Sequence, residues 1–387
     1  MPRTLLAALL ASALQATAAD VGVEDIQSRR ASGLADDVSS AQSMQVPRWT
    51  ASLEAIALNR TNGGVSQPLT NTVPAEMTYA QTRLPSLSSE AFNSNQFAQG
   101  FEVGPKITLN YRGEAGHGLE LSYFSVRNLH DSRTTGPNGL WLTMYGPGVF
   151  WQTQDFPNQG FIWSSASNLN SAEVNAKKEI GKDLRLLAGF RWFRLDDSLS
   201  GAVSPSDEYL PAWKTSAVCN PNPTFQNLLA CAPGQIATAT PSNFSTFWMS
   251  STANKLLGVQ IGAEGALLSI GKLSLGGSLK AGVYSNRATQ NSAVSMAKNF
   301  YYVSANSNRA AYAAEGTVEV KYQVSTDLAI RLGYSLLWLD RVALAPGQIS
   351  KTLATFAAGS PNLMATGVNT GADVLFHGGT LGLEYSF

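Results

Sequence analysis

The chain has 387 residues, its 27 lysines and arginines equal its 27 aspartates and glutamates, and only 14% of its residues are charged. A neutral, weakly charged chain produces no field that attracts nucleic acid, so we exclude a nucleic-acid-binding protein. Its apolar residues alternate with polar ones and rarely form continuous runs, which is untypical of a soluble globular enzyme. No later stretch supplies about 18 consecutive apolar residues, so we expect no transmembrane helix.

The N-terminus has the features of a signal peptide. Arg3 precedes an apolar run from Leu5 to Leu14, and small residues follow at Ala16-Thr17-Ala18, as in cleavable secretory leaders. We predict a signal peptide over residues 1–19 and export to the bacterial outer membrane. Residues 20–48 are polar without sustained periodicity, so we expect a periplasmic tail.

From Trp49 to the C-terminus, short segments alternate apolar and polar residues with a period of two, which predicts strands with one apolar face. The first segment, 49–60, has the weakest pattern, because Leu53 lies on one face while Ile56 and Leu58 lie on the other. Nine segments with a clearer pattern follow: 101–111, 119–123, 171–176, 184–193, 257–264, 273–284, 317–322, 328–338 and 380–387. In the segment 184–193, Leu187 and Phe193 are exceptions that fall on the polar face.

The connections between these ten strands alternate in length. Short links are expected at 112–116, 179–183, 267–272 and 325–327, and long links at 61–99, 130–166, 197–252, 286–310 and 340–373. Transmembrane barrels pair short periplasmic turns with long external loops, and their strands of about a dozen residues span an apolar band of roughly 25 Å. Residues 49–387 therefore predict an all-β, up-and-down antiparallel transmembrane barrel. A twelve-strand alternative remains, because residues near Trp141 and Met144, or Phe247 and Met249, also favour strands.

The sheet must close, because unpaired backbone groups in hydrocarbon cost several kcal/mol each. Its polar face then lines the lumen. The charged residues on that face either form a selectivity lining or pair with one another and plug a narrow barrel. Besides Glu315, the predicted lumen residues are Glu102, Lys106, Glu120, Glu173, Arg185, Arg191, Glu264, Lys280, Glu319, Lys321, Arg331 and Glu384.

Two cysteines, Cys219 and Cys231, lie in one polar stretch, and an exported chain meets an oxidising compartment, so we expect a disulfide within an external loop. At the C-terminus, Leu381, Leu383, Tyr385 and Phe387 alternate with polar residues and glycine. This pattern resembles the assembly signal of outer-membrane barrels, which predicts docking on the barrel-assembly machinery. The other expected partners are outer-membrane lipid and lipopolysaccharide.

Catalytic chemistry has little support in the sequence. Only His117, His130 and His377 are present, and none lies in a recognisable nucleophile motif. The cysteines have no histidine nearby in sequence to complete a zinc site of about four ligands. We expect neither an enzyme nor a bound cofactor or metal.

Four short segments resemble the beta-barrel porin type 7 family of bacterial outer-membrane proteins. They are Gly118-Leu-Glu-Leu-Ser-Tyr-Phe124, Ser171-Ala-Glu-Val-Asn175, Leu187-Ala-Gly-Phe-Arg191 and Leu256-Leu-Gly-Val-Gln-Ile-Gly262. The resemblance covers residue 49 to the C-terminus and implies a barrel with a pore, but no catalytic residue or cofactor. The first strand departs from it, because the family begins with a more aromatic strand.

We therefore expect a narrow, porin-like channel for small solutes or ions. The alternative is a non-conducting structural or adhesive surface barrel, since ten strands leave little internal space. A barrel hydrolase is the third reading.

Overall fold

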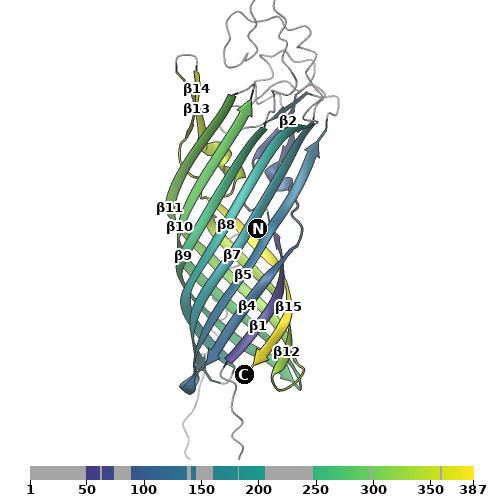
Figure 1. Ribbon diagram of the computed structural model, residues 1–387, viewed down its shortest axis with the longest axis vertical. Helices are drawn as coiled ribbons and strands as arrows, with labels where there is room; N and C mark the ends of the chain where they lie inside the picture. The colour runs from purple at the N-terminus through teal and green to yellow at the C-terminus, as the bar shows by residue number, and fades with distance from the viewer. Residues whose placement is uncertain are drawn as a thin grey trace, which may run out of the picture. The chain divides into compact units, whose positions relative to one another are not determined.

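The computed structural model describes residues 49–61, 63–73, 89–136, 141–144, 160–181, 183–204, 247–296, 299–357 and 360–387. Within these residues, ten antiparallel strands form a closed barrel in the order β1-β15-β12-β11-β10-β9-β8-β7-β5-β4 (Figure 1). The predicted fold class and the count of ten barrel strands are confirmed. The predicted signal peptide and N-terminal tail lie outside the described residues.

The strands of the barrel differ in length. They are β1 (Trp49–Arg60), β4 (Glu102–Arg112), β5 (His117–Thr135), β7 (Gly160–Ile180), β8 (Leu184–Ser204), β9 (Phe247–Ile270), β10 (Leu273–Met296), β11 (Asn299–Gln323), β12 (Leu328–Val342) and β15 (Ala372–Ser386). The length of about a dozen residues is right for β1 and β4 and too short for β7 to β11, which have 21 to 25 residues.

Tight turns join the strands at one end of the barrel, where the sequence predicts them. The β9–β10 turn consists of Gly271 and Lys272, and the β4–β5 turn contains the short helix η4 (Glu114–Gly116). Gly116, Gly181 and Gly271 have φ of +71°, +72° and +58°, a backbone region that glycine enters without steric cost. In outer-membrane barrels such short turns face the periplasm, so we call this the periplasmic end and the other the extracellular end.

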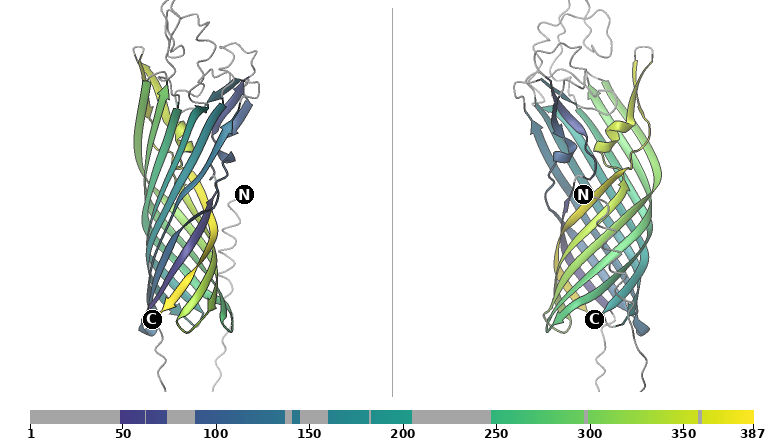
Figure 2. Two further views of the ribbon diagram at one scale, coloured as in Figure 1. Left: turned by 45° about the vertical axis from the view of Figure 1, so that its right-hand side comes forward. Right: turned by 180° about the vertical axis from the view of Figure 1, so that it is seen from behind.

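The extracellular end differs from the predicted pattern of loops. The expected link at 286–310 is mostly strand, because β10 continues to Met296 and β11 begins at Asn299. Its residues pair in uninterrupted register. The exposed outward residues there include Arg287, Ser304, Asn306 and Asn308, and such polar residues interrupt the apolar alternation that marks a strand in lipid. The long strands β7 to β11 rise together beyond the shorter strands of the wall (Figure 2).

Small elements occupy the links at the extracellular end. Strands β2 (Pro68–Val73), β3 (Ser89–Asn93) and β6 (Trp141–Met144) form a separate sheet, and β13 (Thr352–Ala357) pairs with β14 (Ser360–Ala365). The short helices η3 (Ser94–Gln96) and η7 (Pro346–Lys351) precede β4 and β13. The twelve-strand alternative is wrong, because β6 pairs with β2 outside the barrel and Phe247 and Met249 belong to β9.

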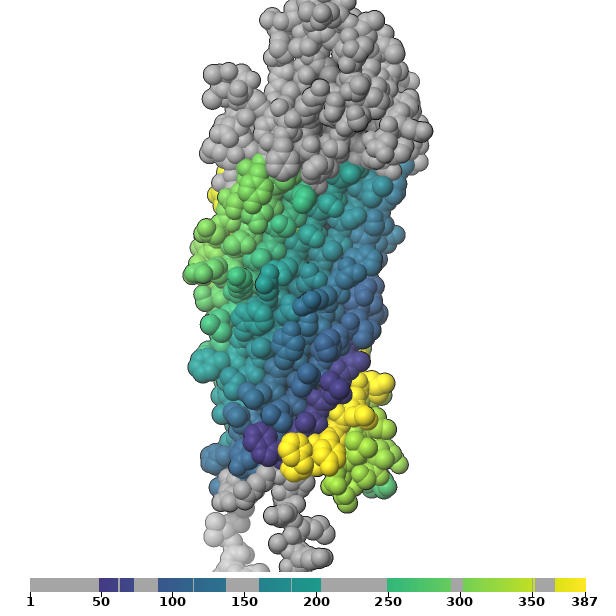
Figure 3. Space-filling view, viewed as in Figure 1, coloured from purple at the N-terminus to yellow at the C-terminus, as the bar shows by residue number. Residues whose placement is uncertain are grey.

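The outer surface of the barrel is apolar over the periplasmic and middle part of the wall. Large side chains such as Val103, Leu257, Ile261 and Leu332 are more than half exposed there. Neighbouring strands run obliquely across this surface (Figure 3). Soluble proteins rarely expose apolar patches of more than a few hundred Å², and a closed sheet leaves no unpaired edge to hydrocarbon. The chain is therefore a barrel of the outer-membrane type.

Reciprocal backbone hydrogen bonds close the barrel at the periplasmic end. Trp49 N–H donates to the Phe387 carbonyl oxygen over 3.0 Å, and Phe387 N–H donates to the Trp49 carbonyl oxygen over 2.9 Å. Among the described residues, no helix is long and apolar enough to cross a membrane.

Candidate functional site in the barrel interior

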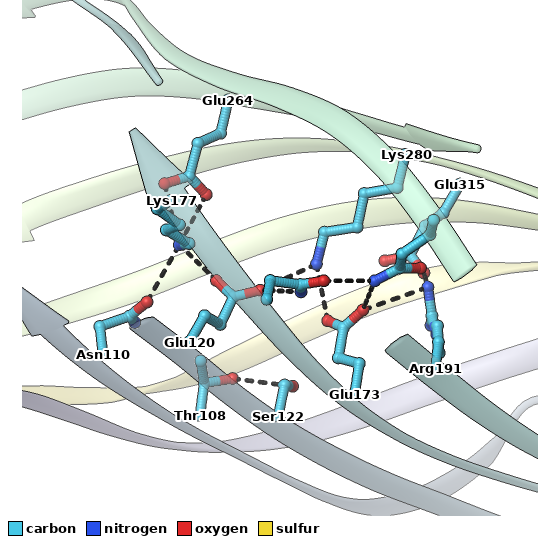
Figure 4. A network of polar contacts seen from close by, with 12 residues as sticks. Thr108, Asn110, Glu120, Ser122, Glu173, Lys177, Arg191, Glu264, Lys280 and Glu315 are labelled. Carbon is cyan, nitrogen blue, oxygen red and sulfur yellow. Dashed lines mark hydrogen bonds and ion pairs between the residues drawn. The ribbon is translucent and has the colours of Figure 1, made fainter. Parts of the chain in front are cut away.

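The interior of the barrel contains two networks of charged side chains toward the periplasmic end. In the first, Lys280 Nζ on β10 lies 3.0 Å from Glu120 Oε1 on β5 and 2.6 Å from Glu173 Oε1 on β7 (Figure 4). Lys177 on β7 pairs with Glu120, and its Nζ lies 2.9 Å from Glu264 Oε1 on β9. Lys177 and Glu120 lie on paired strands, but the other three contacts join strands that are not neighbours in the wall, so the network crosses the interior.

Two arginines extend this network. Arg191 Nη1 lies 2.6 Å from Glu315 Oε2 and 3.6 Å from Glu173 Oε2, with only 3% of the arginine side chain exposed. Arg185 Nε lies 3.1 Å from Glu264 Oε1 near the periplasmic end, where the arginine is half exposed. A charge as deeply buried as that of Arg191 persists only when it is paired and hydrogen-bonded. The carboxylates of the network are the partners of Arg191.

The second network is centred on Arg331 of β12. Its Nη1 lies 3.0 Å from Glu384 Oε2 and 3.5 Å from Glu54 Oε1, and its Nη2 pairs with Glu319. Lys106 Nζ lies 3.1 Å from Glu54 Oε2, and Lys321 pairs with Glu384. These contacts join five strands on the other side of the interior, namely β1, β4, β11, β12 and β15.

Both networks are balanced in charge. The first contains the cations Lys177, Arg185, Arg191 and Lys280 and the carboxylates Glu120, Glu173, Glu264 and Glu315. The second contains the cations Lys106, Lys321 and Arg331 and the carboxylates Glu54, Glu319 and Glu384. The first network therefore has four positive and four negative charges, and the second has three of each. Neither network has the surplus of one sign that rings of like charge give to selective pores.

The twelve residues predicted to line the lumen fall into two groups. Eleven of them belong to the two networks. Glu102 does not: it lies at the extracellular end of β4, where its Oε1 is 3.7 Å from His130 Nδ1. Glu54 and Lys177 also belong to the networks but were missed. Both lie at positions of polar parity on their strands, β1 and β7, so the alternation already contained the signal.

An apolar layer crosses the interior on the extracellular side of the charged networks. Phe193, Leu195, Leu169 and Phe376 are fully buried in it. Every barrel strand except β4 contributes; the other members are Ile56, Leu58, Phe124, Val126, Leu129, Leu256, Tyr284, Ala311, Ala313, Leu337, Leu339, Val342, Leu344, Ala372 and Val374. The guanidinium of Arg191 lies 4.3 Å from the ring centroid of Phe193, which joins the two layers. Buried side chains from nine strands thus form one apolar cluster inside the barrel.

The segment after β12 enters the barrel on the extracellular side of the apolar layer, to which its Leu344 belongs. Ala343 N–H donates to Asn254 Oδ1 over 2.7 Å, and its carbonyl oxygen accepts from Asn254 Nδ2 and Thr252 Oγ1 over 2.8 and 2.9 Å. Ala345 N–H donates to Asp197 Oδ2 over 2.7 Å. Asp197 also pairs with Arg60. Residues 343–349 are buried, so this segment fills the interior at a third level.

The predicted assembly residues lie on β15, which pairs with β1 and β12. Leu381, Leu383, Tyr385 and Phe387 all point outward and are more than half exposed. Recognition by the assembly machinery stays a prediction. Cys219 and Cys231 lie outside the described residues, and the predicted disulfide with them.

The three histidines lie in different places. His117 Nε2 contacts Lys178 Nζ over 3.1 Å, His130 contacts Glu102, and His377 Nδ1 lies 2.9 Å from the Tyr334 hydroxyl. Within the described ranges, no histidine contacts both a carboxylate and a hydroxyl nucleophile. In the same part of the chain, no three His, Cys, Asp or Glu side chains are arranged to hold a metal ion.

No protein-family model matches the chain, and no curated protein sequence does, so the resemblance to the porin type 7 family is not confirmed. Solved structures with a similar fold include the outer-membrane protease OmpT of Escherichia coli, at 10% identity and a TM-score of 0.46, covering 90% of this chain and 100% of that one. Another is the translocator domain of the autotransporter NalP of Neisseria meningitidis, at 8% identity and 0.33, covering 89% and 90%.

The toluene transporter TbuX of Ralstonia pickettii is similar at 9% identity and a TM-score of 0.31, covering 89% of this chain and 90% of that one. These proteins share a barrel architecture with the chain and differ in what they do, so no functional residue is carried over from them. The chain itself is a closed ten-stranded barrel of the outer-membrane type.

Proposed function

We propose that this protein is a closed outer-membrane barrel that acts at the cell surface and does not form an open diffusion pore. The observation that carries the proposal is the apolar layer, in which side chains from nine of the ten barrel strands meet inside the barrel. A porin-like channel needs a continuous water-filled path. Buried leucines and phenylalanines across the lumen interrupt such a path, and hydrophobic constrictions block ions by excluding water.

The charged networks support the same proposal. Each cation is matched by carboxylates within the networks, and the side chains of Glu120, Glu173, Lys177, Lys280 and Arg191 are all less than 10% exposed. Side chains that satisfy one another in this way act as internal packing. A selectivity lining would leave charged groups facing water.

The extracellular extension is the part of the protein that would meet other molecules. Strands β8 to β11 continue beyond the apolar band. Their exposed outward residues there include Ser198, Ser200, Asn306 and Asn308, together with Met249 and Tyr302. We propose a structural or adhesive role for this extension, without enzymatic activity. The separate positions of the three histidines support that absence of catalysis.

Planar-bilayer recording of the refolded full chain tests the proposal. We expect no conductance steps from the wild type. The triple variant Phe193→Ala, Leu195→Ala and Leu337→Ala removes buried side chains from the apolar layer, and we expect it to conduct. Phe190→Ala is the control, because Phe190 lies on the outer face of the same strand and is 62% exposed. Regular steps from the wild type, comparable to those of an open porin, would overturn the proposal.

The second candidate is a gated channel for small solutes or ions. It is favoured by the segment Ala343–Ile349, which enters the lumen from the extracellular side and is held there by hydrogen bonds with the side chains of Asn254 on β9 and Asp197 on β8. In that case Asp197→Ala, which removes one of these bonds, produces conductance while the apolar layer is intact. A closed barrel stays closed in this variant.

A further inference from the structure

Three cations lie in one cross-strand row on the outer face of the barrel. Arg194 on β8 is directly opposite Lys255 on β9, and Lys255 is directly opposite Arg287 on β10. All three side chains are exposed. Neighbouring strands are about 4.8 Å apart, so the outer two of the three residues are separated by roughly 10 Å. The strands that carry them lie side by side on the face drawn in Figure 3.

The row lacks matching negative charge. Arg194 Nε lies 2.8 Å from Asp196 Oδ2 on the same strand. Lys255 and Arg287 form no ion pair among the described residues. Asp196 is the one acid at an outward position on the extracellular parts of β7 to β11, as far as these strands are described. Like charges placed directly opposite each other destabilise a sheet, so the row retains a net positive charge that an external anion would neutralise.

The row also marks a boundary on the outer surface. Two residues toward the periplasm on β9, Leu257 is 61% exposed, followed by Val259 at 54% and Ile261 at 69%. On β8 the corresponding outward residues are Trp192 and Phe190. Toward the extracellular end, the outward residues become polar on β8 and β10, as at Ser198 and Thr289. The change from apolar to cationic therefore occurs at one level on β8 and β9, and on β10 Ser285 separates Val283 from Arg287. In a barrel embedded in the outer membrane, the edge of the apolar band is the level expected for the lipid headgroups of the outer leaflet.

We propose that Arg194, Lys255 and Arg287 form a binding site for the phosphorylated sugar headgroup of an outer-leaflet glycolipid, the chemistry of lipopolysaccharide. Phosphate oxygens accept charge-assisted hydrogen bonds from arginine and lysine. The acyl chains of the same lipid would lie against Leu257, Val259 and their neighbours. Charge complementarity and the position of the row at the edge of the apolar band together select a lipid over a soluble anion.

Native mass spectrometry of the refolded full chain in detergent micelles, titrated with bisphosphorylated lipid A, tests the proposal. The triple variant Arg194→Gln, Lys255→Gln and Arg287→Gln is expected to bind at least about tenfold more weakly, since several charge-assisted hydrogen bonds are lost. The matched control is Arg133→Gln, Lys178→Gln and Lys272→Gln. It removes the same charge from three exposed positions outside the row and is expected to bind like the wild type.

Two further ligands identify what is bound. Lipid A with its phosphates removed and its acyl chains unchanged is expected to bind as weakly to the wild type as lipid A binds to the row variant. Inorganic phosphate alone is expected neither to protect the fold nor to displace the lipid. Equal binding of the dephosphorylated lipid, an equal loss in the control variant, or displacement by inorganic phosphate would each overturn the proposal.

A folding defect in the triple variant would be visible as loss of heat-resistant migration on a denaturing gel. The single substitutions then decide the question. Lys255→Gln is expected to weaken lipid binding, whereas Lys255→Arg retains the charge and is expected to preserve it. Identical affinities for these two single variants would contradict a phosphate contact at Lys255.

Discussion

Lys280 and Glu120 form an ion pair across the inside of the barrel, with Nζ and Oε1 3.0 Å apart. Three strands, β9, β8 and β7, separate β10 from β5 in the wall. The pair therefore bridges the interior and does not follow the sheet. Arg331 instead contacts Glu319 and Glu384 on the two strands paired with β12, and Glu54 on β1, one strand further along the wall. Opposite charges in the periplasmic part of the interior thus pack the barrel as apolar side chains pack a soluble core.

Replacing Lys280 by methionine is expected to destabilise the barrel by about 3–5 kcal/mol, because Glu120 and Glu173 lose a buried partner while they stay charged. Urea unfolding in micelles, followed by tryptophan fluorescence, measures the change. Lys272→Met is the control, since Lys272 is exposed in the β9–β10 turn; its effect is expected within about 0.5 kcal/mol. Equal effects of the two variants would show that the internal pairing does not stabilise the fold.

Glycine 378 allows β15 to pack closely beside β1. A Cβ atom there would collide with the backbone oxygen of Ala57, whereas a Cβ on Gly379 would come no closer than 3.7 Å to the Gly333 oxygen. Because a backbone atom cannot rotate away, Gly378→Ala is expected to destabilise the closed barrel by about 1–3 kcal/mol. Gly379→Ala should be neutral or slightly stabilising. The temperature at which the folded band disappears on a denaturing gel compares them, and the opposite ranking would refute the close approach.

Asp197 holds the inserted segment, because its Oδ2 accepts the Ala345 N–H. In Asp197→Ala, amide hydrogen exchange over Ala343–Ile349 is expected to accelerate at least about tenfold, since loss of a buried hydrogen bond favours local opening. The neighbouring substitution Asp196→Ala is the control. Asp196 lies on the outer face and pairs with Arg194, so exchange in the segment should not change. Unaltered exchange in Asp197→Ala would indicate that the segment is retained by packing alone.

Phenylalanines 193 and 190 lie on opposite faces of β8, one fully buried inside and one 62% exposed outside. Phe193→Ala is expected to cost about 3–5 kcal/mol, because the surrounding walls cannot collapse into the cavity. Phe190→Ala should cost less, since mobile acyl chains can refill the space beside it. Unfolding in lipid vesicles measures both. A larger loss for Phe190→Ala would argue that the apolar layer is loosely packed.

The period of two was sufficient to predict the barrel, its strand count and its short turns. In a strand, successive side chains point to opposite faces, and a chain in lipid must satisfy all backbone hydrogen bonds by closing its sheet. The first constraint acts locally and repeats along the chain, and the second requires the resulting strands to form a closed sheet. The predicted strand ends were wrong where the outer face no longer contacts lipid. The extracellular ends of β10 and β11 carry polar residues outside, so the apolar alternation ends before the strands do.

Parity also placed eleven of the twelve predicted residues in charged networks, but it could not say which of them meet. The contacts depend on the stagger of the strands, which brings Lys280 on β10 close to Glu120 on β5 although three strands lie between them in the wall. The apolar layer was hidden for a related reason. Ile56, Leu58, Leu187 and Phe193 seemed to interrupt the polar face, and only the closed barrel shows that Ile56, Leu58 and Phe193 belong to one buried cluster inside it. The side chains that face each other across the interior are decided by how the sheet closes, and closure depends on the pairing of all ten strands.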